Sequence, residues 1–176
     1  MNPTRFYPFI MLLLLFSCRS KAQEDSLAGY VASIYKQKID TAEILIDTDG
    51  KAVKLADAVG KKVKLIYVFN DRSCGANFDH ALFRLRSNKD KIAPKDVLML
   101  FTGDKMRDMR IYEQLFLPYR ILKAKYKPII SGNMELGLPY FYTLSANSKV
   151  AQNVFIPKKE DDQRTNEYLD NIMLKD

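Results

Sequence analysis

The chain has 176 residues, of which 47% are hydrophobic and 28% charged. This balance excludes an intrinsically disordered protein, and the length suits one domain with a sizeable core rather than two. The net charge is +7, but the lysines recur in small groups such as Lys61, Lys62 and Lys64. That spacing indicates a solvated surface rather than a nucleic-acid site, and it is also compatible with contact with an anionic membrane surface.

The N-terminus is typical of a secretory signal peptide. Arg5 precedes a hydrophobic stretch, residues 9–16, which is much shorter than the ~20 residues that span a bilayer. Two processing sites compete within residues 1–22. In one, Cys18 is lipidated as the first residue of a lipoprotein; in the other, an ordinary signal peptide ends at Ala22. Both predict export to the bacterial periplasm or envelope, the first with a lipid anchor in the membrane.

The cysteine count limits the chemistry of the mature protein. Cys18 and Cys74 are the two cysteines of the chain. If Cys18 is acylated or removed, Cys74 is left as an unpaired thiol and no intramolecular disulfide can form. An unpaired thiol is unusual in an oxidising compartment.

The first half of the chain alternates helical and extended patterns. Apolar residues at helical spacing predict an N-terminal helix within residues 27–35, and residues 44–46 predict a short strand. A turn follows at residues 47–50, and residues 53–59 form a brief helical or extended segment. Residues 63–69 are apolar at nearly every position, which favours a strand covered on both faces.

The second half continues this alternation. Helical spacing begins at Asn77, a second buried strand is predicted at residues 97–101, and a helix over residues 106–117 is ended by Pro118. Residues 139–144 and 150–156 predict an antiparallel hairpin. The last helical stripe is Tyr168, Leu169, Ile172 and Met173. The resulting order is β-α-β-α-β-β-α, preceded by a helix and a strand, which is an α/β class.

Two further patterns carry expectations about side chains. His80 lies off the apolar stripe of its helix, which predicts that it faces solvent, and one histidine with one remaining cysteine forms no metal site. In the helix before Pro118 a core-facing stripe is predicted, made of Met106, Met109, Tyr112, Leu115 and Phe116.

The junction after the first buried strand reads VFNDRSCGAN and places Cys74 five residues after Phe69. Pro139 opens a later strand in GLPYFYTLS. With this element order, the sequence from about residue 43 to 174 resembles the thioredoxin-like superfamily, in particular its exported TlpA-like and peroxiredoxin-like branch. The resemblance implies a single thioredoxin-like domain over residues 23–176. Its central mixed sheet would be flanked by helices, with an extra N-terminal helix and strand, and a cis-proline would lie at Pro139.

The resemblance breaks down at the resolving cysteine. In the dithiol mechanism one thiolate attacks a disulfide and a second thiol resolves the product, but Asn77 stands where C-x-x-C would place that second thiol. Asp71 likewise replaces the threonine of the peroxiredoxin pattern. Dithiol-disulfide oxidoreductase activity is therefore not expected, whereas Cys74 at a helix N-terminus keeps a position that favours thiolate.

Three hypotheses follow. In the first, an extended protein or peptide binds in a groove between Cys74 and Pro139, with Leu138, Pro139 and Asn77 as binding residues. Asn77 could instead cap its helix or donate a hydrogen bond to the Cys74 sulfur. The second is a monothiol redox protein in which Cys74 works with an external resolving thiol. The third is a scaffold whose active face is irrelevant. None of the three calls for a cofactor, metal or nucleic acid, and the sequence does not indicate the oligomeric state.

Overall fold

A computed structural model describes residues 29, 31–32, 35, 37–71, 73, 75–124, 138–145 and 147–172. The predicted signal peptide, Cys18 and Cys74 lie outside these residues. Of the predicted N-terminal helix, Gly29, Val31, Ala32 and Tyr35 are described; the first three are helical and Tyr35 lies in a turn.

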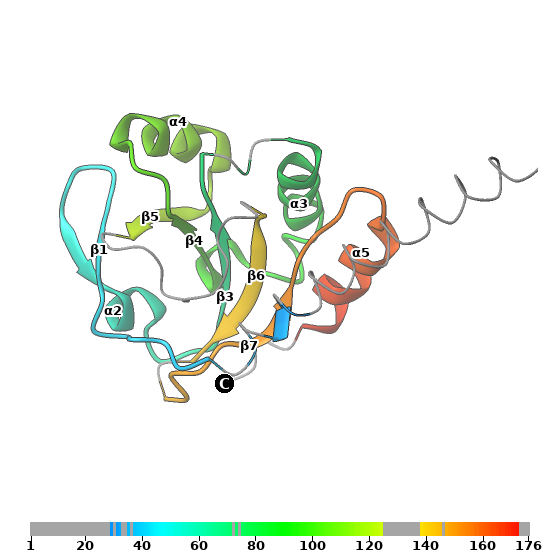
Figure 1. Cartoon of the computed structure of the whole chain (residues 1–176), viewed down its shortest axis with the longest axis horizontal. Coiled ribbons are helices and arrows are strands. Elements are labelled where there is room, and N and C mark those ends of the chain that lie inside the picture. The colour runs from blue at the N-terminus through cyan, green and yellow to red at the C-terminus, as the bar shows by residue number, and fades with distance from the viewer. Residues whose placement is uncertain are drawn as a thin grey trace, which may run out of the picture.

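A seven-stranded sheet forms the centre of the protein (Figure 1), with strand order β2-β1-β5-β4-β3-β6-β7. The elements are β1 (Ile44–Ile46), β2 (Ala52–Lys54), α2 (Leu55–Val59), β3 (Lys64–Phe69), α3 (Ala76–Ser87), the 3-10 helix Pro94–Asp96, β4 (Val97–Phe101), α4 (Met106–Phe116), β5 (Arg120–Ala124), β6 (Tyr140–Leu144), β7 (Gln152–Phe155) and α5 (Asp162–Asn171).

The sheet is mixed, as the resemblance implies. β3, β4 and β5 run parallel to one another, while β6 pairs antiparallel with β3, and β7 with β6. The hairpin of β1 and β2 is attached antiparallel to β5. Consecutive parallel strands need a crossover, and α3 and α4 supply the two crossovers here.

β5 is an element that the sequence analysis missed. Its five residues, Arg120 to Ala124, include two cations and follow Pro118 closely, so they lack the continuous apolar run of β3 and β4. Three of them are nevertheless buried, because β5 lies between β4 and β1 rather than at an edge. The position of the strand in the sheet, not its composition, makes it a core strand.

Two hydrophobic clusters cover the two faces of the sheet. One packs Phe78 of α3, Phe116 of α4 and Leu169 of α5 against a single face. The other packs Leu55 of α2 and Ile39 against the opposite face. Figure 1 shows α2 on the other side of β3 and β6 from α3 and α5.

The chain before β1 crosses the second face. Ile39 donates its backbone N–H to the Lys149 carbonyl at 2.8 Å, and the Ala151 N–H bonds the Gln37 carbonyl at 3.0 Å. These contacts lie just before β7, whereas β1 lies toward the other side of the sheet. Residues 37–43 therefore cross the sheet, and two residues of this segment, Ile39 and Thr41, are buried.

The predicted stripe of the helix α4 is correct in part. Met109 and Phe116 are fully buried, and Met106 and Tyr112 pack against the same cluster. Leu115 is 52% exposed, so its assignment to the core was wrong. It lies at the margin of the helical stripe, where coverage depends on the neighbouring helix rather than on periodicity.

Within the described residues, no helix combines the length and apolar character needed to cross a bilayer.

Candidate functional site

The junction after β3 has the predicted strand-loop-helix form. Phe69 ends the strand, and its carbonyl accepts hydrogen bonds from the Thr102 N–H at 2.9 Å and the Thr102 hydroxyl at 3.1 Å. The loop is closed on itself, because the Ser73 N–H donates to the Asn70 carbonyl and the Asn70 N–H donates to Ser73 Oγ, both at 3.1 Å. These bonds hold Asn70 and Ser73 together directly after β3.

Gly75 occupies the N-cap position of the helix α3. Its φ of 137° lies in the region that glycine adopts without the steric penalty of a Cβ. Position 74 of the sequence is thus flanked by Ser73, which belongs to the closed turn, and by Gly75 at the N-terminus of the helix. The unpaired N–H groups of such a turn favour a negative charge nearby.

An aromatic cluster holds α3 on the sheet. The Phe78 ring lies 5.4 Å from that of Phe69 and 5.3 Å from that of Phe116, measured between ring centroids. Phe69 and Phe116 are themselves 5.1 Å apart, with nearly perpendicular rings. Edge-to-face packing of this kind adds to the burial energy of each ring. The first two turns of α3 are consequently fixed relative to the end of β3.

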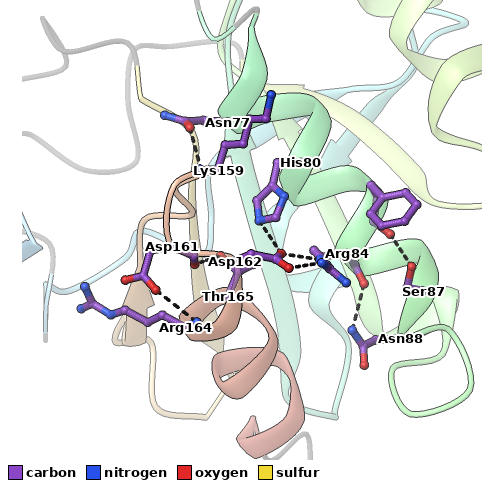
Figure 2. Close-up of polar contacts among 11 residues, drawn as sticks. Asn77, His80, Arg84, Ser87, Asn88, Lys159, Asp161, Asp162, Arg164 and Thr165 are labelled. Carbon is purple, nitrogen blue, oxygen red and sulfur yellow. Dashed lines mark hydrogen bonds and ion pairs between the residues drawn. The ribbon is translucent and has the colours of Figure 1, made fainter.

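Asn77 links the same turn to a distant loop (Figure 2). Its Oδ1 accepts a hydrogen bond from the backbone N–H of Lys159 at 2.9 Å. Asn77 lies inside the helix and Gly75 occupies the N-cap position, so the expectation that Asn77 caps the helix is wrong. The amide instead connects α3 to the segment between β7 and α5.

His80 also faces α5 rather than solvent, and the sequence-based expectation for it is wrong. Its side chain is 10% exposed, and Nε2 lies 3.2 Å from Oδ1 of Asp162. The contact has the distance of an ion pair but lacks the alignment of a hydrogen bond. Asp162 is held in turn by Arg84, whose Nε donates to Oδ1 at 2.5 Å and whose second nitrogen donates to Oδ2. Figure 2 shows these side chains between the two helices.

Pro139 lies at the same end of the sheet as the junction. It is buried and directly precedes β6, where Tyr140 pairs antiparallel with Val68. Continuing that register by one residue places Pro139 beside Phe69. Leu138 is half-buried and packs against the second hydrophobic cluster. The structure thus brings Leu138 and Pro139 to the edge of the sheet from which α3 departs.

Comparison with known proteins gives structural matches alone. No family model matches the chain, and no curated protein matches its sequence. Peroxidoxin BcpB from Mycobacterium tuberculosis is 13% identical, with a TM-score of 0.54 over 79% of this chain and 99% of that one. A protein from Aquifex aeolicus VF5, proposed to transfer electrons, is also 13% identical, with a TM-score of 0.55 over 77% of this chain and 92% of that one.

The fold is thioredoxin-like. At 13% identity the likeness concerns the fold, and the residues of the site must carry any statement about chemistry.

This thioredoxin-like fold departs from the expected pattern at its proline. Among the described residues, the peptide bond that is cis is Leu117–Pro118, and Leu138–Pro139 is not cis. The expectation of a cis-proline at Pro139 is therefore wrong, although Pro139 does lie beside the end of β3.

Further polar atoms, which the sequence did not reveal, are buried on the face of the sheet opposite to α3. Gln37 Oε1, Glu43 Oε1 and the Tyr142 hydroxyl are buried, and none has a hydrogen-bond partner in the part of the chain that is described. Burial, and secondarily the negative charge of Asp40, raises the pKa of Glu43 from 4.5 to about 7. Burial and the Glu43 charge also raise the pKa of Tyr142. Glu43 and Tyr142 are far apart in the sequence, and no local signal marks their interaction.

The described residues contain no group of three or more His, Cys, Asp or Glu side chains placed to hold a metal ion.

Proposed function

We propose that this is an exported thioredoxin-fold protein that binds an extended protein or peptide partner between Cys74 and Pro139 and lacks the means to release it by dithiol exchange. Asn77 carries the proposal. It stands at the resolving position of a C-x-x-C pattern, and its side chain accepts a hydrogen bond from Lys159. The Cys74 thiolate would attack a disulfide of the partner, forming a mixed disulfide with one sulfur and releasing the other as thiolate; the Asn77 amide cannot attack that mixed disulfide in turn, so the partner stays joined.

Export is part of the proposal. It rests on the basic and hydrophobic pattern of residues 1–22, which places the protein in the bacterial periplasm or envelope, with a lipid on Cys18 or cleavage after Ala22. Intact mass of the protein isolated from its native envelope distinguishes the two mature forms. A mass that still contains residues 1–22 would contradict export by this route.

The binding proposal is tested by trapping. We expect protein isolated from its native envelope with thiols blocked to carry a disulfide-linked partner, which reductant releases and which a Cys74→Ser variant lacks. Leu138→Ala should reduce the amount trapped, because Leu138 flanks the groove. Equal trapping in the Leu138→Ala variant, or no linked partner on the native protein, would overturn the proposal.

A sharper version of the trapping experiment restores the missing thiol. In Asn77→Cys, the new thiol should resolve the adduct, so the trapped fraction falls and a disulfide between residues 74 and 77 appears. Asn77→Ser is the matched control, because it also removes the amide bond to Lys159 but adds no thiol. If both variants lower trapping equally, the lost bond and not the lost thiol explains the effect, and the reading of Asn77 as a missing resolving residue fails.

The alternative function is a monothiol redox protein that uses Cys74 with an external resolving thiol. It is favoured by the position of residue 74 directly before Gly75, which caps α3, because a helix N-terminus stabilises thiolate. The pH profile of Cys74 alkylation should then give a pKa clearly below the ordinary ~8.5. An ordinary pKa, with no reaction toward peroxide or disulfide, would exclude this function.

A further inference from the structure

A cavity of about 320 Å³ lies at the end of the sheet opposite to the junction between β3 and α3. β3, β4 and β5 are parallel, so their first residues, Lys64, Val97 and Arg120, gather at one edge. All three line the cavity. The proposed partner-binding groove would lie at the carboxyl end of β3, so the cavity is a separate site and does not depend on the proposed function.

The cavity is basic. Its lining includes Lys64, Lys95 and Arg120, and none of the described residues that line it is acidic. Lys64 donates from Nζ to the Lys95 carbonyl, which holds the Lys64 ammonium beside the 3-10 helix that contains Lys95. The side chains of Lys95 and Arg120 are exposed, and neither has an ion-pair partner among the residues that the structure describes.

Three like charges around one cavity repel one another, and an anion placed between them removes that repulsion. From this we infer that the cavity binds a phosphate ester. Arg120 offers the planar fork that bonds two phosphate oxygens at once, and Lys95 adds a compact positive charge. No aromatic side chain is among the described lining residues, so nothing there stacks a nucleotide base. The volume is at the lower end of ligand cavities and suits a small ester.

The phosphate can belong to a soluble ester or to the headgroup of a phospholipid. Next to the cavity, Leu117 is 64% exposed and immediately precedes Pro118, which lines it; Leu115, at 52% exposed, lies two residues earlier. Exposed apolar side chains beside a basic site are also found where proteins rest on anionic membranes. Both sources present the same phosphate chemistry, and the experiment below separates them.

The test uses the full mature chain with two probes. One is sn-glycerol 3-phosphate, titrated by calorimetry; the other is a phosphatidylglycerol vesicle, with phosphatidylcholine as its neutral counterpart, in a sedimentation assay. The variant is Lys95→Gln/Arg120→Gln, whose side chains are exposed and whose folding is checked by its melting temperature. The control is Lys105→Gln/Arg107→Gln, which removes the same charge from exposed positions at the start of α4.

We expect the cavity variant to weaken binding by at least about tenfold, since hydrogen bonds between charged groups are among the stronger ones, and the control variant by about twofold or less. Arg120→Lys keeps the positive charge but loses the planar guanidinium, so its loss of binding should lie between those of the two double variants. Binding of the free ester assigns a soluble ligand, and binding to phosphatidylglycerol vesicles alone assigns a headgroup. Equal losses in the two double variants, or no binding of either probe, would overturn the inference.

Discussion

Glu43→Gln should stabilise the protein at neutral and alkaline pH. Glu43 lies on the segment that crosses the sheet toward β1, and its Oε1 is buried without a hydrogen-bond partner among the described residues. Burial, then the nearby Asp40 charge, raises its pKa from 4.5 to about 7. Glutamine keeps the shape of the side chain and removes the charge that burial disfavours.

The direction in which pH changes the free energy of unfolding follows from proton linkage. Because the folded-state pKa is above that of the unfolded chain, the folded protein holds its proton over the window from 4.5 to about 7, where the unfolded chain has released it. The native protein therefore loses stability as pH rises through this window, and the loss levels off above it. The full difference would be roughly 3 kcal/mol. Since Glu43 is half-buried, water screens part of it, and we expect about 1–2 kcal/mol.

The assay is urea unfolding of the native protein and the variant at pH 4, 6 and 8. The free energy of unfolding of Glu43→Gln should match that of the native protein at pH 4 and exceed it by about 1–2 kcal/mol at pH 8. Glu160→Gln, at an exposed position, is the control and should follow the native protein throughout. A gap that is constant with pH, or a native protein that is the more stable at pH 8, would refute the reasoning.

Two further pairs of substitutions, each measured by urea unfolding, test the packing of the helices. Phe116→Ala removes a fully buried ring and should cost about 3–5 kcal/mol, whereas Leu115→Ala should change stability by less than about 0.5 kcal/mol; similar costs would contradict the observed burial. Asp162→Asn weakens the contacts with Arg84 and His80 and should cost about 1 kcal/mol, because the group is partly exposed. Asp170→Asn disrupts the exposed pair with Lys91 and should cost less than Asp162→Asn. An equal cost would show that the contacts of Asp162 between α3 and α5 contribute no more to stability than an exposed ion pair.

The strands and helices around the candidate site were predictable because their signals are local. β3 and β4 are apolar at nearly every position, which is sufficient to predict strands covered on both faces. The spacing of Phe78, Ala81, Leu82 and Leu85 likewise identified α3, and all four are buried. β5 was missed because its two cations interrupt the apolar pattern of a buried strand. It is an internal strand because it pairs with β4 on one side and β1 on the other.

The absence of a second thiol at position 77 is a fact of the sequence alone, and it already argues against dithiol exchange. What Asn77 and His80 do instead was decided by tertiary structure. Each contacts a residue 82 positions away, Lys159 and Asp162 respectively, and no local pattern records a contact at that separation. The same is true of the basic cavity: Lys64, Lys95 and Arg120 read as scattered surface charges until three parallel strands bring their amino ends together. Local periodicity specifies which segments form strands and helices, whereas the neighbours of an individual side chain depend on how those segments pack.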